Sequence, residues 1–307
     1  MKILAIETSC DDTGIAILEV ESTGNFKVLS NIVSSQIEIH QKFGGVYPAM
    51  AKREHQKNLV PAFAKALEET KMLKLKNKNT KTKSEVLDKI LEREPELEKQ
   101  LIPFLEKYEK PDIDLITVTN GPGLEPCLWV GINFTKALSH SWNIPVVATN
   151  HIESHILVNL LESPSIKFPA IALVVSGGHT QIILMKKIGK YKILGETRDD
   201  AAGECFDKCA KILGLGYPGG PIISKLASQL QTADCKLQTK LPRPMINSKD
   251  YDFSFSGLKT AVLYADRKVK NKTQEYKKQM AAEVQQAIID VLIKKTIKAV
   301  KDFNAKT

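Results

Sequence analysis

The sequence predicts an α/β protein made of two duplicated lobes. Two segments share one pattern, in which an apolar strand leads into a loop of small and polar residues and then into a second strand. The strands fall at 3–8 and 15–20 in the first segment and at 170–175 and 181–185 in the second. A repeated unit of this kind predicts a sheet and helices in each half. We expect the two loops to face each other across a cleft.

Further buried strands and helices are expected between and after these segments. Residues 115–119 and 146–149 are short runs rich in apolar and β-branched residues, which favour strands. The first run leads into Asn120-Gly121-Pro122-Gly123, a turn that glycine and proline form easily. Helices are predicted over residues 133–142 and about 274–303.

Composition sets one stretch of the N-terminal half apart. We expect an N-terminal lobe at 1–145, with a surface insertion at 71–111, and a C-terminal lobe at 146–307. The insertion begins with six lysines and no acid between Lys71 and Lys83, and continues as an acidic, helix-forming run to Lys107. Such a composition predicts a segment that is flexible at first and then helical.

The charge is distributed unevenly along the chain. The net charge is +9, and residues 236–307 hold 16 basic and seven acidic residues. Basic charge gathered here and at Lys71–Lys83 indicates a polyanionic partner, for which tRNA or another nucleic acid is the natural candidate. A solvated, lysine-rich surface is the alternative interpretation.

Bulk properties predict a soluble, cytoplasmic protein. Of the 307 residues, 43% are hydrophobic and 26% charged, which is ordinary for a globular protein. No apolar run approaches the roughly 18 residues of a membrane span, and the N-terminus turns acidic at Glu7, too early for a signal peptide. The five cysteines are an odd number and widely scattered, which favours a reducing compartment over a disulfide framework.

The segment Asn150-His151-Ile152-Glu153-Ser154-His155 is the sharpest candidate site. Two histidines at positions i and i+4 of a helix lie one above the other, so both rings can reach one metal ion. A zinc protease needs a glutamate directly after the first histidine, whereas Glu153 stands two positions on. The pattern therefore predicts a metal site and argues against a metalloprotease. A chance pairing on a surface helix is the alternative.

Two glycine-containing segments predict a phosphate or nucleoside site. Val174-Val175-Ser176-Gly177-Gly178 follows a buried strand, and its glycines let backbone N–H groups approach a phosphate or acyl group. Further on, Asp207 on a helix suits a ribose hydroxyl, and Gly219-Gly220 leaves room for a nucleoside. A solvated acid is the alternative for Asp207. Residues 252–259 alternate apolar and polar side chains, which is typical of an edge strand leading into a helix.

Together these segments resemble one family, the tRNA N6-adenosine threonylcarbamoyltransferases, once described as O-sialoglycoproteases. The matching stretches are 5–12, 44–46 with Pro48, 53–55, 120–124, 151–155, 175–181, 199–208, 217–221 and 252–260. The match covers nearly the whole chain except the insertion. The resemblance implies an actin-like ATPase fold with two RNase H-like lobes.

The resemblance also implies an activity and its site. The activity is transfer of the threonylcarbamoyl group from threonylcarbamoyl-adenylate to N6 of the adenosine beside the anticodon, in tRNAs that read codons beginning with A. By match to the family pattern, His151 and His155 would bind one divalent metal, iron or zinc. The adenylate would be held by Val174, Val175, Ser176, Gly177, Gly178, Asp207 and Gly220.

Our candidates for the base that accepts a proton from the attacking amine are Asp11 and Asp12, in the first loop. The family usually has Asp-Glu at these positions, so the second carboxylate of this chain is shorter. The family also continues beyond this chain's last residue with a strand, a glycine-rich loop that contacts the nucleoside and an aspartate that completes the metal site. We therefore expect the sequence to be a fragment or the protein to be impaired.

The resemblance implies three protein partners: the threonylcarbamoyl-adenylate synthase, an inactive paralogue and a small ATPase. Two other functions are compatible with the predicted fold. An ATPase or sugar kinase would use the two loops, but it has no need of an imidazole-bound metal. A catalytically silent scaffold, like the paralogue, generally lacks the histidine pair that this chain has at His151 and His155.

Overall fold

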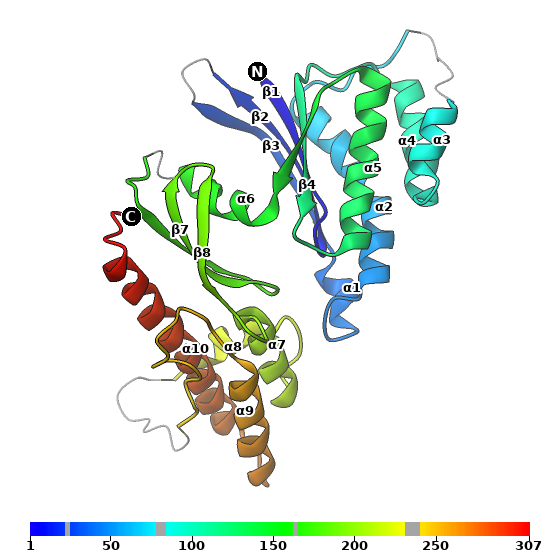
Figure 1. Ribbon diagram of the computed structural model, residues 1–307. Helices are drawn as coiled ribbons and strands as arrows, with labels where there is room; N and C mark the ends of the chain where they lie inside the picture. Colours follow the sequence, from blue (N-terminus) through cyan, green and yellow to red (C-terminus); the bar gives the residue numbers. More distant parts are fainter. Residues whose placement is uncertain (22–24, 78–83, 162–164, 231–239) are drawn as a thin grey trace. The chain divides into compact units, whose positions relative to one another are not determined.

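The computed structural model describes residues 1–21, 25–77, 84–161, 165–230 and 240–307 (Figure 1). The chain divides into two compact units, Met1–Ser154 and His155–Thr307. The predicted α/β class is confirmed, since each unit combines one β-sheet with helices. A domain boundary between residues 145 and 146 stays a prediction, as does a cleft between the two loops.

The first unit is built on a five-stranded sheet with the order β3-β2-β1-β4-β5. Its strands are β1 (Lys2–Glu7), β2 (Asp12–Val20), β3 (Phe26–Ser35), β4 (Leu115–Gly121) and β5 (Val146–Asn150). The first three strands form an antiparallel meander, and β4 and β5 run parallel to β1. The carboxyl ends of β1, β4 and β5 therefore meet at one edge of the sheet, where ligand sites of α/β proteins collect.

In the part of the first unit that the structure describes, five helices lie entirely within the unit. They are α1 (Ile37–Gln41), α2 (Pro48–Glu69), α3 (Glu85–Leu91), α4 (Pro95–Lys107) and α5 (Glu125–Trp142). Helices α2 and α5 pack on the sheet, and α3 and α4 pack outside them (Figure 1). Phe63 of α2 contacts the rings of Phe134 and Trp142 of α5, so aromatic packing joins the two inner helices.

The predicted insertion contains the expected helices, but its side chains are not confined to the surface. Leu91, Leu97 and Leu101 are fully buried and belong to the same core cluster as the sheet. Buried Glu94 accepts a hydrogen bond from Gln56 of α2 at 2.7 Å. The interpretation as a surface segment is therefore wrong for α3 and α4, because their leucines face the core; part of the lysine-rich tract, residues 78–83, lies outside the described residues.

The second unit contains a three-stranded antiparallel sheet with the order β6-β7-β8. Its elements are β6 (Ala170–Val175), β7 (Thr180–Lys187), β8 (Lys190–Glu196), a 3₁₀ turn (Val158–Leu161), α7 (Ala202–Ile212), α8 (Gly219–Ala227), α9 (Ser256–Lys268) and α10 (Gln274–Asp302). Helix α6 (His151–Leu157) precedes the sheet and contains the boundary between the units. Both predicted strand–loop–strand segments are confirmed as antiparallel hairpins, β1–β2 and β6–β7.

The segment at 252–259 departs from its prediction. Phe253 makes a single bridge to Thr197, and α9 begins at Ser256, so the expected helix is present but the edge strand is not. The alternation arises because Phe253 and Phe255 are fully buried while the serines around them face Asp199. Among the described residues, no helix is long and apolar enough to cross a membrane.

Candidate functional site

His151 lies at the carboxyl edge of the first sheet, against the end of β1. Its Nδ1 atom is 3.3 Å from Oε2 of Glu7, the last residue of β1, and 3.2 Å from Oγ of Ser9. The other carboxylate oxygen of Glu7 accepts a hydrogen bond from the backbone N–H of Ser9 at 2.5 Å. The strand end, the first loop and the first residue of α6 thus meet around one carboxylate.

The carboxylate of Glu7 is held in its charged form. Burial acts to raise its pKa, but hydrogen bonds from His151 and Ser9 outweigh this effect and hold the pKa at about 2. A group with this pKa is an acceptor, not a proton donor, at neutral pH.

The loop after β1 is fixed by close packing against α5. The hydroxyl of Thr8 donates to the carbonyl of Cys127 at 2.9 Å, and the N–H of Leu124 donates to the carbonyl of Ser9 at 2.7 Å. A Cβ on Gly123 would lie 2.7 Å from the same carbonyl of Ser9, and one on Gly131 would lie 2.4 Å from Thr8 Oγ1. Glycine is required at both positions because the loop backbone and side chain occupy that space.

His55 of α2 holds the same loop from the other side. It is fully buried, and its Nε2 lies 3.1 Å from the carbonyl of Cys10. Because a carbonyl can only accept, Nε2 carries the proton and Nδ1 accepts from the hydroxyl of Thr13, 2.8 Å away. Burial lowers the pKa of His55, which favours this neutral tautomer.

The two candidate bases occupy different positions beside these anchors. Asp11 is half-buried, and its carbonyl accepts from the N–H of Gln36 at 3.1 Å. Asp12 is exposed and is already the first residue of β2, where it pairs with Ser35. The predicted loop is therefore shorter than expected.

Helix α6 carries both predicted metal-ligating histidines. Asn150 caps its first turn, because its Oδ1 accepts from the N–H groups of Ile152 and Glu153 at 2.9 and 3.0 Å. His151 is the first residue of the helix and His155 follows one turn later, as predicted. The helix therefore presents two imidazoles at the spacing that metal sites use.

The glycine loop of the second unit is tightly folded against α7. The hydroxyl of Ser176 accepts from the N–H of Gly178 at 3.3 Å and of His179 at 3.0 Å. The N–H of Gly203, in the first turn of α7, donates to the carbonyl of Ser176 at 3.1 Å, and a Cβ on Gly203 would lie 2.8 Å from Gly177 Cα. No atom lies within 4 Å of a Cβ built on Gly177 or Gly178, so this face of the loop is open.

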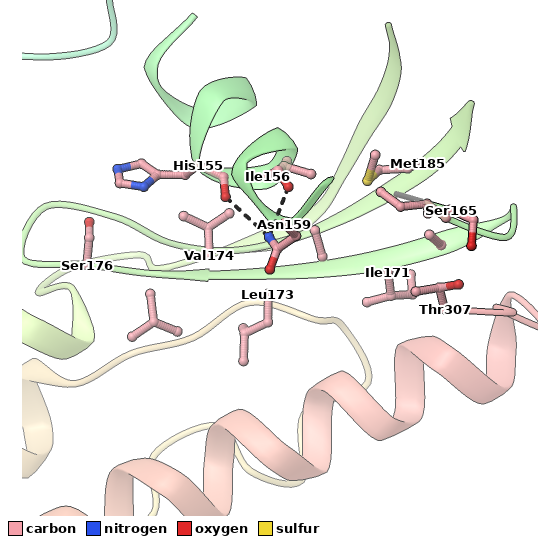
Figure 2. Close-up of a pocket in the computed structure, with 14 residues that line it drawn as sticks. His155, Ile156, Asn159, Ser165, Ile171, Leu173, Val174, Ser176, Met185 and Thr307 are labelled. Atoms are coloured by element: carbon pink, nitrogen blue, oxygen red, sulfur yellow. Dashed lines mark hydrogen bonds between the residues drawn. The ribbon is translucent and has the colours of Figure 1, made fainter. Parts of the chain in front are cut away.

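A cavity of about 560 Å³ lies along β6 in the second unit. Val174, Val175 and Ser176 line it together with His155. Figure 2 shows His155 and Ser176 at one end of the cavity and Thr307 at the other. Its wall on the α6 side is held by Asn159, whose amide donates to the carbonyls of His155 and Ile156 at 3.5 and 2.9 Å (Figure 2).

Asp207 has a structural contact that the sequence did not reveal. Its Oδ1 accepts from the N–H of Gly219 at 2.7 Å, at the start of α8. A Cβ on Gly219 would lie 2.6 Å from Asp207 Cα, so α7 and α8 are in close contact here. A Cβ on Gly220 would have one neighbour, Phe206 Cβ, at 4.0 Å. Asp207 thus caps one helix from another, and space remains beside Gly220.

The donor set on α6 suits a borderline metal ion such as iron or zinc, both of which accept imidazole ligands. Among residues 1–21, 25–77, 84–161, 165–230 and 240–307, no cluster of three or more His, Cys, Asp or Glu side chains is placed to hold a metal. The assignment of His151 and His155 as metal ligands stays a prediction. The sequence prediction missed Glu7, Ser9 and His55; the stretches that resemble the family contain all three.

A sequence model of the tRNA N6-adenosine threonylcarbamoyltransferase family (TsaD) matches residues 27–77 and 104–307. The unmatched stretch between these blocks, 78–103, falls inside the predicted insertion. The tRNA N6-adenosine threonylcarbamoyltransferase of Thermosipho africanus is 45% identical over 307 residues, which are 100% of this chain and 79% of that protein. The Syntrophomonas wolfei protein of the same name is 42% identical over 305 residues, 99% of this chain and 77% of that one.

Solved structures with some likeness include YeaZ from Pseudomonas aeruginosa, with a TM-score of 0.35 and 13% identity over 63% of this chain and 64% of that one. The PPX-GPPA enzyme of Aquifex aeolicus has a TM-score of 0.39 and 10% identity over 99% and 93% of the two chains. Sequence identity across the whole chain is the decisive finding. The chain belongs to the tRNA N6-adenosine threonylcarbamoyltransferase family.

Proposed function

We propose that this chain transfers the threonylcarbamoyl group from threonylcarbamoyl-adenylate to N6 of the adenosine beside the anticodon, in tRNAs that read codons beginning with A. The observation that carries the proposal is 45% identity to a named transferase along the whole chain. The α6 histidine pair and the glycine loop after β6 are our candidates for the metal site and the acyl-adenylate site that such a reaction needs. The reaction is expected in the cytoplasm.

The adenylate is assigned to the second unit. Val174, Val175 and Ser176 line the cavity along β6, and Gly177 and Gly178 form the open loop at its end. Asp207 and Gly220, at the junction of α7 and α8, are assigned to the ribose and base because the space beside Gly220 is open.

Developing negative charge on the carbonyl oxygen requires a hydrogen-bond donor at the site. The N–H of Gly178 already donates to Ser176, so the N–H of Gly177 is the better candidate. Removing one such donor from an acyl-transfer site typically lowers kcat by about 10²–10³.

His151 and His155 are assigned to one divalent metal ion, iron or zinc. When bound, the ion polarises the carbonyl toward attack by a weak amine nucleophile. The proton of the attacking amine is assigned to Asp11 or Asp12. Asp12 is the more exposed of the two residues and lies in β2, and Asp11 precedes the strand with its carbonyl accepting from the N–H of Gln36.

The partners are proposed from the family: tRNA, the threonylcarbamoyl-adenylate synthase, an inactive paralogue and a small ATPase. A silent scaffold or an ATPase of the same fold is the second candidate. The spacing of His151 and His155 on α6 favours the transferase, because neither alternative needs an imidazole pair.

The proposal is tested by incubating the chain with threonine, bicarbonate, ATP, unmodified tRNA and the partner proteins, followed by nucleoside analysis of the tRNA. His151→Ala and His155→Ala are each expected to lower the yield of threonylcarbamoyl-adenosine at least 100-fold. Glu153→Gln, on the same helix, is the matched control and should leave the yield unchanged. An unchanged yield in both histidine variants would refute the metal-centred mechanism, and the absence of the modified nucleoside with the wild-type chain would refute the transferase.

A further inference from the structure

We propose that Glu7 is a positioning residue that fixes the ring orientation and tautomer of His151, so that the Nε2 atom of this imidazole is the one that binds metal. This inference rests on the proposed function only in assigning His151 to a metal. The juxtaposition itself lies within the first unit, where β1, the loop after it and the start of α6 meet.

The geometry around Nδ1 of His151 restricts where the ring proton can be. Two oxygens approach this atom, Oε2 of Glu7 at 3.3 Å and Oγ of Ser9 at 3.2 Å. An ionised carboxylate can only accept, whereas a hydroxyl can accept or donate. Only a proton on Nδ1 satisfies both contacts at once, because an unprotonated Nδ1 would place its lone pair against the carboxylate. The neutral ring therefore carries its proton on Nδ1 and its lone pair on Nε2.

Glu7 is itself held in place. Its second oxygen, Oε1, accepts from the backbone N–H of Ser9, so the carboxylate bridges the loop and the imidazole. Ser9 in turn is fixed, because its carbonyl accepts from the N–H of Leu124 at 2.7 Å. The side chain of His151 is only 19% exposed, which further limits its rotation.

This arrangement has a known consequence for metal binding. A metal-ligating histidine commonly donates its second ring N–H to a carboxylate, and this contact orients the ring and raises its basicity. Loss of such a partner typically weakens metal affinity about 10–100-fold. The contact also restricts the orientations of the His151 ring before the ion binds, so less conformational entropy is lost on binding. This saving matters most when the chain offers few ligands.

The tautomer is tested by NMR on metal-free protein labelled with ¹⁵N-histidine, at a pH where the ring is neutral. The His151 signals are identified by their absence in His151→Gln. We expect the wild-type ring to be protonated on Nδ1 and the Glu7→Gln ring to shift toward the Nε2-protonated form, since an amide can donate to Nδ1. Glu153→Gln should leave the spectrum of His151 unchanged. A wild-type ring protonated on Nε2, or the same tautomer in Glu7→Gln, would overturn the proposal.

The second arm titrates the metal-free protein with zinc. Glu7→Gln is expected to weaken binding about 10–100-fold with the thermal midpoint of the protein largely preserved, and Glu7→Asp is expected to recover part of the loss because it keeps the charge. If Glu7→Gln binds zinc as tightly as the wild type, the positioning role is excluded. The NMR arm needs no metal, tRNA or partner protein, so failure of the proposed transferase activity leaves it interpretable.

Discussion

At the scale of single residues, a few polar side chains fix the segments on which the candidate site is built. His55 fixes the backbone at Cys10, and Glu7 fixes the backbone at Ser9. In the second unit Asp199 accepts from the hydroxyls of Ser254 and Ser256 at 2.6 and 2.7 Å. Each of these side chains ties a loop segment to a neighbouring element through hydrogen bonds.

Asp199 predicts a dependence of stability on pH. Burial acts to raise its pKa, but hydrogen bonds from Ser254, Ser256 and the backbone outweigh this and lower the pKa from 3.8 to about 2. Since the folded-state pKa lies below the unfolded one, the stabilisation is complete above about pH 4 and is lost as the pH falls through about 2. Asp199→Asn is expected to be less stable than the wild type at pH 7, with a difference that shrinks between pH 4 and pH 2.

The measurement is urea unfolding at several pH values, with Glu68→Gln at an exposed position of α2 as the control. A difference between Asp199→Asn and the wild type that stays constant from pH 7 to pH 2 would show that the charge of Asp199 is not what stabilises the turn before α9.

Gly131 predicts a second effect at this scale. An added Cβ would lie 2.4 Å from Thr8 Oγ1, so Gly131→Ala must displace either α5 or the end of β1. We expect a loss of about 1–3 kcal/mol in the free energy of unfolding. Gly257→Ala is the matched control, because it also lies in a helix and its nearest neighbour, Pro244 Cγ, is 3.7 Å away. Equal stabilities of the two variants would contradict the close packing described here.

At the scale of elements, periodicity located most of the secondary structure. The strands predicted at 3–8, 115–119 and 170–175 correspond to β1, β4 and β6. They were predictable because each is a short run rich in apolar and β-branched residues, although β6 leaves Leu173 and Val175 exposed. Strand β3 was not predicted, since its serines and asparagine at the sheet edge weaken the apolar alternation.

The insertion shows where composition misleads. The charge of the stretch predicts a solvated segment, and the leucines that anchor it are spaced for one face of a helix. The predicted helices are present, but the sequence did not show which surface of the protein their leucines pack against. Fully buried Leu97 and Leu101 of α4 find that surface in the core of the first unit.

Leu101→Ala is therefore expected to cost about 2–5 kcal/mol in the free energy of unfolding, as for other fully buried leucines. Val86→Ala, at a position 48% exposed on α3, should cost far less. Urea unfolding of both variants provides the comparison. A cost for Leu101→Ala below about 0.5 kcal/mol would show that α4 is not packed into the core of the first unit.

The candidate site was predictable only in part. The spacing of His151 and His155 follows from sequence because one helix carries both. The contact between Glu7 and His151 joins residues far apart in the chain, and only the parallel pairing of β1, β4 and β5 brings them to one edge. Asp207 was predicted as a ligand of ribose, and its contact with Gly219 depends on how α7 meets α8.

At the scale of the whole molecule, the basic charge is the feature that bears on tRNA. Lys268 and Lys270, exposed at and after the end of α9, lie in the basic C-terminal stretch. We expect Lys268→Glu with Lys270→Glu to weaken binding of unmodified tRNA and to reduce the slope of log affinity against log salt by about two. Lys110→Glu, exposed in the first unit, is the control. Equal slopes in all three proteins would place the tRNA contact elsewhere.

The central claim is that this chain acts on the N6 atom of one adenosine. The most direct measurement supplies the chain and its partner proteins with two unmodified tRNAs, identical except that one has guanosine in place of the adenosine beside the anticodon. Mass spectrometry of the digested nucleosides is predicted to show threonylcarbamoyl-adenosine in the first tRNA and none in the second. Absence of the modified nucleoside from the first tRNA, or its presence in the second, would contradict the account.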